Sequence, residues 1–239
     1  MKKGFTLAEI LVSLGVIGIV AAMTIPTLVS SQKKQLWANS LPKAMNTLSN
    51  ASSIMIMKDG AYGLFDSKAW EEMEAGTPVS DAILAHLSNT MIINSAAYTA
   101  VPKTLYGTEV PDLFKDYTAF STKGDITYFI KPILLENNAI HYDIEMIAAD
   151  VLVDINGNEI PNIIGRDIFG FLLTNEGRML PYGTVTANEV VMLDAVTTSA
   201  GNTTRYTNSW KTKCPDSTKR DYGFACTGKV LKEDTKMNY

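Results

Sequence analysis

One carboxylate, Glu9, lies inside a run of otherwise uncharged and mostly apolar residues from Phe5 to Val29. A charged residue at the centre of a bilayer costs about 2.5–3.5 kcal/mol, which suggests that Glu9 has a partner. If the chain is cut between Gly4 and Phe5, the new amino group of Phe5 lies four residues from Glu9, so the two can meet on one helical face. Glu9 can also pair with the amine of a neighbouring chain. The alternative is that Glu9 only extends to the cytoplasmic interface.

The apolar run is long enough to span a membrane. As a helix it extends for roughly 37 Å, compared with a hydrocarbon core of about 30 Å. A secretory signal has its small-residue cleavage site after the apolar stretch, whereas the candidate Gly4–Phe5 junction lies before it. Cleavage there leaves the helix on the product. Gly4 has no side chain, which keeps the backbone at this bond open to an enzyme.

The N-terminal residues resemble the prepilin signature of type IV pilins and type II secretion pseudopilins, KGFTLxE. The matching residues are Lys2, Lys3, Gly4, Phe5, Thr6, Leu7 and Glu9. The resemblance continues to Pro26, where that family commonly has a proline in its membrane helix. It implies cleavage between Gly4 and Phe5 by a prepilin peptidase, methylation of the Phe5 amine, and filament assembly through Glu9. The implied partners are other pilin or pseudopilin subunits, that peptidase, an inner-membrane assembly platform and the lipid bilayer.

The charges that flank the helix bear on its orientation. Lys2 and Lys3 favour a cytoplasmic N-terminus, although Lys33 and Lys34 on the far side nearly balance them. The resemblance implies the same orientation, with the soluble part outside the inner membrane and later in a pilus or pseudopilus, in the periplasm or at the cell surface. We expect a leader at 1–4, a membrane and assembly helix at 5–29, its amphipathic continuation at 30–58, and a globular domain at 59–239.

The composition argues against nucleic-acid binding and catalysis. The formal charge of the 239 residues is −4, and a solvated face is the simpler interpretation of the basic residues near the C-terminus. Neither histidine, His86 or His141, lies beside a nucleophile motif, and the sequence has no phosphate-binding loop, dinucleotide fingerprint or zinc-type cysteine spacing. We therefore expect no catalytic residue, and no cofactor except the calcium considered below.

The only two cysteines, Cys214 and Cys226, have eleven residues between them. The expected orientation puts them in an oxidising compartment, where a disulfide is the natural interpretation. Closing a loop of this size contributes about 3 kcal/mol in the chain-entropy model. A disulfide-closed loop near the C-terminus also resembles many type IV pilins.

The most motif-like stretch of the soluble part runs from Asp154 to Asp167. Asp154, Asn156, Asn158 and Asp167 offer the hard oxygen ligands that calcium prefers, and some pseudopilins bind calcium in an exposed loop. The spacing departs from an EF-hand loop, which needs a bidentate Glu at its twelfth position. The alternative is a turn whose side chains bond to their own backbone.

Apolar residues at intervals of three and four continue the first helix to about Lys58. Pro26 and Pro42 are expected to kink or locally unwind it, because each removes a backbone donor. Two shorter helices should follow, one with Asp66 as N-cap and one with Ser80 or Asp81.

The rest of the sequence predicts a sheet. Ser95 to Lys123 has no sustained period and is expected to be mostly loop. Alternating apolar residues predict strands at 126–130 and 140–146, and short apolar runs predict two more, with turns at Asn137 and Asn138 and at Asn156 and Gly157. The expected strands are 126–130, 140–146, 151–155 and 168–173. The predicted fold is α+β and pilin-like, with a long N-terminal helix packed on an antiparallel sheet and a disulfide-closed C-terminal loop.

Two functions fit these features. The first is a structural subunit of a type IV pilus or type II secretion pseudopilus. A soluble part of roughly 200 residues, large enough for one well-packed domain, favours a minor over a repetitive shaft subunit. The second is a membrane-anchored binding module displayed on a pilus, which recognises a surface, a secreted substrate or DNA.

Overall fold

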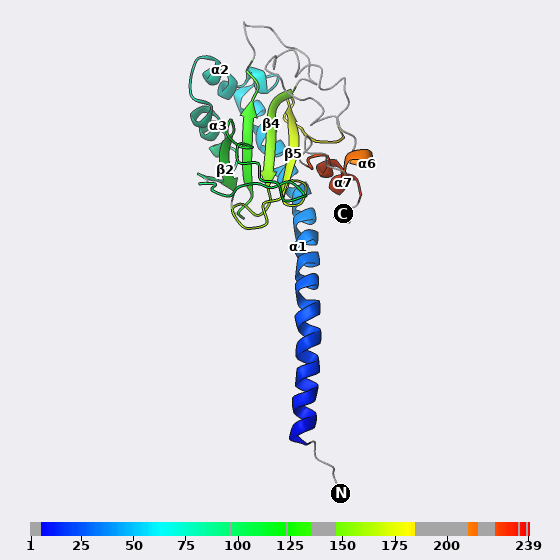
Figure 1. Ribbon diagram of the computed structural model, residues 1–239. Coiled ribbons are helices and arrows are strands. Elements are labelled where there is room, and N and C mark those ends of the chain that lie inside the picture. Colours follow the sequence, from blue (N-terminus) through cyan, green and yellow to red (C-terminus); the bar gives the residue numbers. More distant parts are fainter. Residues whose placement is uncertain are drawn as a thin grey trace.

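The first described element is the helix α1 (Leu7–Asp59), whose N-terminal half projects as a free rod from a globular head (Figure 1). The computed structural model describes residues 6–95, 97–122, 124–134, 147–184, 210–214, 223–233, 235–237 and 239. Gly60 ends α1 in the left-handed conformation, with its N–H directed to the carbonyls of Ile56 and Met57. The predicted end near Lys58 is confirmed to within one residue.

Of the two effects predicted for Pro26 and Pro42, kinking or local unwinding of α1, the local unwinding is wrong. The helix is continuous through both prolines, and Figure 1 shows it as a nearly straight rod. Each proline removes one N–H from the ladder. The ladder bonds on both sides of each proline keep the flanking turns in one helix of 53 residues.

The C-terminal half of α1 packs into the head through a stripe of small and apolar side chains. Their spacing of three and four places them on one helical face. The fully or almost fully buried members are Ala38, Leu41, Ala44, Leu48, Ala51 and Met55. Two hydrogen bonds fix the helix on the sheet. The Tyr128 hydroxyl donates to the Ala44 carbonyl (3.0 Å), and the Met179 N–H donates to the Ser49 hydroxyl (2.9 Å).

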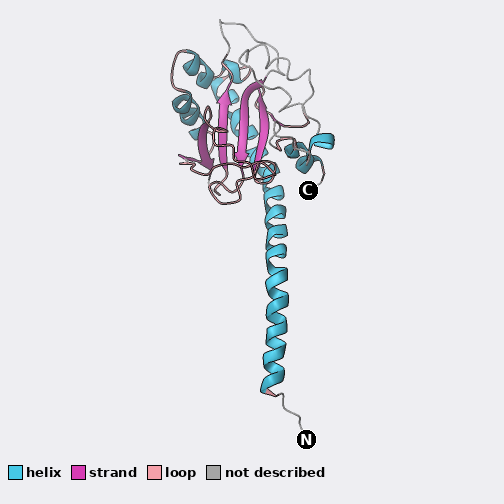
Figure 2. Cartoon of the chain, in the orientation of Figure 1, coloured by secondary structure: helices cyan, strands magenta, loops and turns pink. Residues whose placement is uncertain are grey.

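A six-stranded antiparallel sheet lies against this half of α1 (Figure 2). Neighbouring strands follow chain order, so that each strand pairs with the next. The strands are β1 (Ile93–Ser95), β2 (Thr118–Thr122), β3 (Thr127–Pro132), β4 (Ile147–Asp154), β5 (Ile168–Thr174) and β6 (Met179–Pro181). The strand predicted at 151–155 is the second half of β4, and the one at 168–173 is β5. The predicted α+β fold is therefore confirmed.

Both faces of the sheet are covered, which explains why β4 and β5 are buried along their whole length. Phe169 and Phe171 face α1, whereas Ile168 and Leu172 face a second cluster that includes Phe129. Aromatic side chains from the segment 97–117, together with Tyr182 and Phe224, cover this second face. The alternation follows from the two-residue period of a strand.

The short helices differ from the prediction at their starts. The helix α2 (Lys68–Glu74) begins one residue later than an Asp66 cap requires, because Asp66 ends a 3₁₀ turn. The carboxylate that accepts its first N–H belongs to Asp59, nine residues before Lys68. The helix α3 (Val79–Ser88) follows Pro78, so that Ser80 and Asp81 lie inside its first turn.

Three strands were missed, and a fourth, predicted strand lies outside the described residues. The prediction of loop from Ser95 to Lys123 missed β2, in which only Phe120 is buried, and the sequence also gave no signal for the short edge strands β1 and β6. The strand predicted at 140–146 and the turn at Asn137 and Asn138 lie outside the described residues. The turn at Asn156 and Gly157 is confirmed.

Candidate functional site

The candidate assembly surface is the N-terminal half of α1, which no other described part of the chain covers. Its apolar window is not buried, and it is long and apolar enough to cross a membrane. The exposed side chains include Leu7, Leu11, Leu14, Ile17, Val20, Met23 and Leu28. An apolar surface of this size requires a bilayer or other helices to cover it.

Glu9 lies at the start of this rod and forms a capping box with Thr6. The Glu9 carboxylate accepts hydrogen bonds from the Thr6 N–H and hydroxyl, each at 2.8 Å. The Thr6 hydroxyl in turn accepts the Glu9 N–H at 3.3 Å. The box satisfies backbone donors that the first helical turn leaves without partners. It also turns the carboxylate toward the N-terminal end of the helix.

Sequence analysis missed the role of Thr6, although the Thr-x-x-Glu spacing is the signature of a capping box. Gly4 and Phe5 lie outside the described residues, so the predicted cleavage, methylation and amine pairing stay predictions. Pro26 lies in the exposed half of α1.

Of the four residues proposed for calcium, Asp154 ends β4, and Asn156, Asn158 and Asp167 belong to the loop between β4 and β5. The two aspartates approach each other because Asp154 pairs with Ile168 across the two strands. Asp154 accepts the Tyr98 hydroxyl at 2.7 Å, and Asp167 accepts the backbone N–H groups of Asn162 and Ile163. Both aspartates are fully buried.

The two asparagines of the loop also bond mainly to backbone. Asn158 accepts the N–H groups of Thr99 and Ala100 at 2.8 and 3.2 Å and donates to the Ala97 carbonyl. Asn156 donates to the Glu159 carbonyl at 2.7 Å. The Asn156 and Asp167 side chains therefore bond to the backbone of their own loop, as the alternative of a backbone-bonded turn expects. The structure adds that Asn158 ties this loop to the segment 97–100.

The hydrogen bonds of these four residues decide which of their side-chain oxygens are free to bind calcium. Of the four residues' side-chain oxygens, those of Asp154, Asn158 and Asp167 already accept hydrogen bonds. The Asn156 Oδ1 is the one buried side-chain N or O atom in the described part without a partner. The described residues include no cluster of three or more His, Cys, Asp or Glu side chains that would hold a metal. Calcium binding stays a prediction, which calorimetric titration tests: no heat and no thermal shift would contradict it.

Burial of the two carboxyl groups changes their protonation. Burial raises the pKa of Asp167 to about 6, although the N–H groups of Ile163 and Asn162 oppose the rise. Burial and the neighbouring Asp167 also raise the pKa of Asp154 well above its ordinary value. The folded chain therefore holds protons here that the unfolded chain releases.

The expected consequence is a loss of stability on raising the pH from about 4 to about 6. The native state binds more protons in this window, so the free energy of unfolding falls as the pH rises, by about 3 kcal/mol for Asp167 alone. Denaturation of the chain in micelles, followed by the fluorescence of buried Trp70, measures this. The difference in the free energy of unfolding between the wild type and the Asp167→Asn variant should change with pH. A pH-independent difference would contradict the expectation, and Asp112→Asn, at an exposed carboxyl, is the control.

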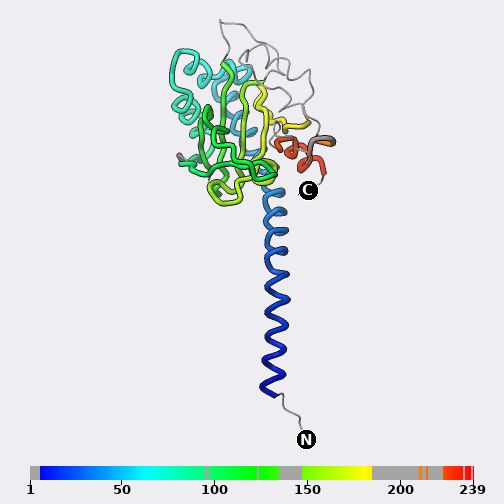
Figure 3. Tube along the Cα trace, viewed as in Figure 1, coloured from blue at the N-terminus to red at the C-terminus, as the bar shows by residue number. Residues whose placement is uncertain are grey.

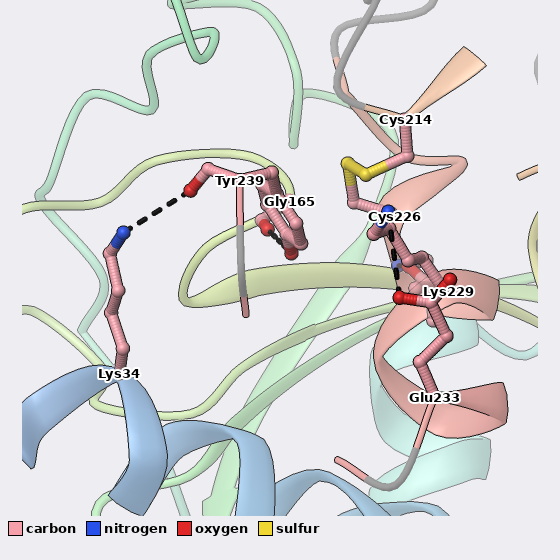
Figure 4. Close-up of a disulfide and its surroundings, with 9 residues drawn as sticks. Lys34, Gly165, Cys214, Cys226, Lys229, Glu233 and Tyr239 are labelled. Atoms are coloured by element: carbon pink, nitrogen blue, oxygen red, sulfur yellow. Dashed lines mark hydrogen bonds and ion pairs between the residues drawn. A yellow bond between two sulfur atoms is a disulfide. The ribbon is translucent and has the colours of Figure 1, made fainter. Parts of the chain in front are cut away.

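The C-terminal region contains the predicted disulfide. Cys214 follows α6 (Trp210–Lys213), and Cys226 begins α7 (Cys226–Lys232). The bond is present between them, with their Cα atoms 4.9 Å apart (Figure 4). Both cysteines are buried.

The end of the described chain lies against α1. Figure 4 shows the Tyr239 hydroxyl directed to the Gly165 carbonyl and the Lys34 ammonium directed to the Tyr239 main-chain oxygen, at 3.2 Å. The Thr235 hydroxyl donates to the Asn39 side chain at 3.1 Å. The tail thus joins α1 to the β4–β5 loop at the point where α1 enters the head.

Comparison with known protein families finds a match at the N-terminal end of the chain. Residues 1–25 match the family model of the prokaryotic N-terminal methylation motif. No curated protein and no solved structure matches the chain. The motif suggests a structural, non-enzymatic subunit that assembles with other pilin subunits and meets the prepilin peptidase. The chain therefore carries at its N-terminus the signature of type IV pilins and pseudopilins, which supports a type IV pilin-like or pseudopilin subunit.

Proposed function

We propose that the chain is a minor subunit of a type IV pilus or a type II secretion pseudopilus. It is made with residues 1–4 as leader and spans the inner membrane once through residues 5–29, with a cytoplasmic N-terminus. The prepilin peptidase removes the leader, and the assembly platform inserts the subunit into the filament. The observation that supports this most is the methylation motif on a helix half that the head leaves uncovered.

The structure of α1 suits a subunit that lies first in the bilayer and later in a filament. Its exposed half is apolar on all sides, so it is stable among lipid chains and equally stable among other apolar helices. Its head half is held by a buried stripe and two hydrogen bonds to the sheet. The rod can therefore move from bilayer to filament while the head keeps its fold.

Gly4→Leu is expected to block maturation, because a bulky side chain obstructs the approach of the peptidase to the bond before Phe5. Gel mobility and N-terminal sequencing of the membrane fraction measure this. Lys3→Leu is the matched control, since it places the same side chain one residue farther from the bond. A mature N-terminus in the Gly4 variant would contradict the proposal.

A further inference from the structure

Two loops and the neck of α1 form one surface at the end of the head from which α1 leaves. We call this surface the base; it consists of residues 32–37, 97–117 and 155–167. Figures 1 and 3 show both loops at this end of the sheet. The loops are joined, because the Lys103 N–H donates to the Asn162 carbonyl and the Ile164 N–H donates to the Lys103 carbonyl, both at 2.8 Å. Tyr239 links Gly165 to Lys34 on α1.

The base exposes large apolar and aromatic side chains. Ile160 is 80% exposed, Tyr106 is 72% exposed and Leu36 is 64% exposed. Trp37 is partly exposed next to Leu36. Aromatic residues with a polar tip are typical of the level at which a protein crosses from hydrocarbon to water.

In the part of the chain that the structure describes, the base also has cations without carboxylate partners. Within the described ranges, neither Lys33 nor Arg166 forms an ion pair. Partial burial and the nearby Arg166 lower the pKa of Lys34, so the surface brings positive charges together. Among the exposed carboxylates of the two loops, Glu109 is held by Lys103 at 3.1 Å and Asp116 by Lys131 at 3.3 Å. Among the described residues, Asp112 and Glu159 form no ion pair.

The length of α1 places this surface at the level of the lipid headgroups. The apolar run ends at Val29, and Lys33 follows four residues later, about 6 Å farther along the helix. The headgroup layer on each side of the hydrocarbon core is about 5–8 Å thick. A head that begins its contacts with α1 at Lys34 therefore lies close to the membrane surface while α1 spans the bilayer.

We propose that the base binds anionic phospholipid headgroups of the membrane that α1 spans. Arg166 and Lys33 contact the phosphates, and Tyr106 and Ile160 enter the interface beside them. The inference rests on the proposed membrane anchoring and adds a second contact, which must be released before the subunit joins a filament.

Hydrogen exchange of the full chain in nanodiscs tests this contact. One chain per disc is compared in discs of phosphatidylcholine alone, in discs that also contain phosphatidylglycerol, and in uncharged detergent micelles. We expect residues 97–117 and 155–167 to exchange several-fold more slowly in the phosphatidylglycerol discs only. Each basic residue near an anionic surface changes the docking equilibrium about fivefold, so Arg166→Gln should reduce the protection by that factor.

Matched variants separate contact from folding. Tyr106→Asp and Ile160→Asp should abolish the protection, whereas Tyr62→Asp, at a 90% exposed residue just beyond the far end of α1, should keep it. Lys68→Gln, at the start of α2, is the control for Arg166→Gln.

Three results would overturn the proposal. Equal exchange in both kinds of disc would exclude anionic lipid, and protection that requires two chains per disc would assign the base to a second copy. A chain recovered outside the discs would contradict the membrane anchoring as well, whereas an anchored chain without protected loops contradicts only the lipid contact.

Discussion

Glu9→Gln is expected to reduce co-purification of other pilin-like subunits more than tenfold while leaving the chain in the membrane. Removing one partner of a buried charge pair costs about 2–5 kcal/mol, which corresponds to a factor of roughly thirty or more. Gln at this position still reaches back to the helix start in a capping box. The substitution therefore removes the charge and keeps the local fold.

Thr6→Ala is the matched variant, because it removes the hydroxyl that bonds to Glu9 and keeps the carboxylate. Loss of a cap costs about 1 kcal/mol of helix stability, so assembly should fall by no more than about fivefold. Quantitative mass spectrometry of affinity-purified complexes measures the loss of co-purified subunits in both variants. Equal losses in the two variants would contradict a role for the charge and assign Glu9 to capping alone.

The double substitution Cys214→Ser and Cys226→Ser is expected to lower the free energy of unfolding by about 3 kcal/mol, from loop closure alone. The effect should be concentrated in the C-terminal region. α7 is anchored independently, since the Thr227 hydroxyl accepts the Gly170 N–H at 3.0 Å and Val230 lies in the core. The disulfide ties α6 to this anchor.

Urea denaturation in micelles, with and without reductant, measures the contribution of the disulfide. The reduced wild type should behave as the double variant does, which separates the loss of the bond from the effect of serine. Limited proteolysis should cut near α6 before it cuts the sheet. A stability change below about 1 kcal/mol would contradict the entropic account.

The sequence predicted the elements whose signal is local. The N-terminal apolar run, the stripe from Leu41 to Met55 and the short apolar run of β5 are each visible within one segment. β2 gave no such signal, because four of its five residues are only half-buried and three of them are hydroxyl-bearing. Its position is fixed by pairing with β3.

Contacts between segments that are distant in the chain could not be predicted from the sequence. The cap of α2 comes from Asp59, and the partner of Asp154 is Tyr98, 56 residues earlier in the chain. The motif at the N-terminus predicted Glu9, but the base became visible only when the fold brought Lys103 beside Asn162 and Arg166 near Lys34. Local patterns predict elements, whereas the juxtaposition of loops depends on the packing of the whole head.

The most direct test of the account is the N-terminus of the native chain after extraction from the membrane. Intact-mass and N-terminal peptide analysis should find a mature chain that begins at Phe5, has a methylated amine and retains the whole of α1. A chain that begins downstream of Ser30, or one that is found in the soluble fraction, would contradict the account.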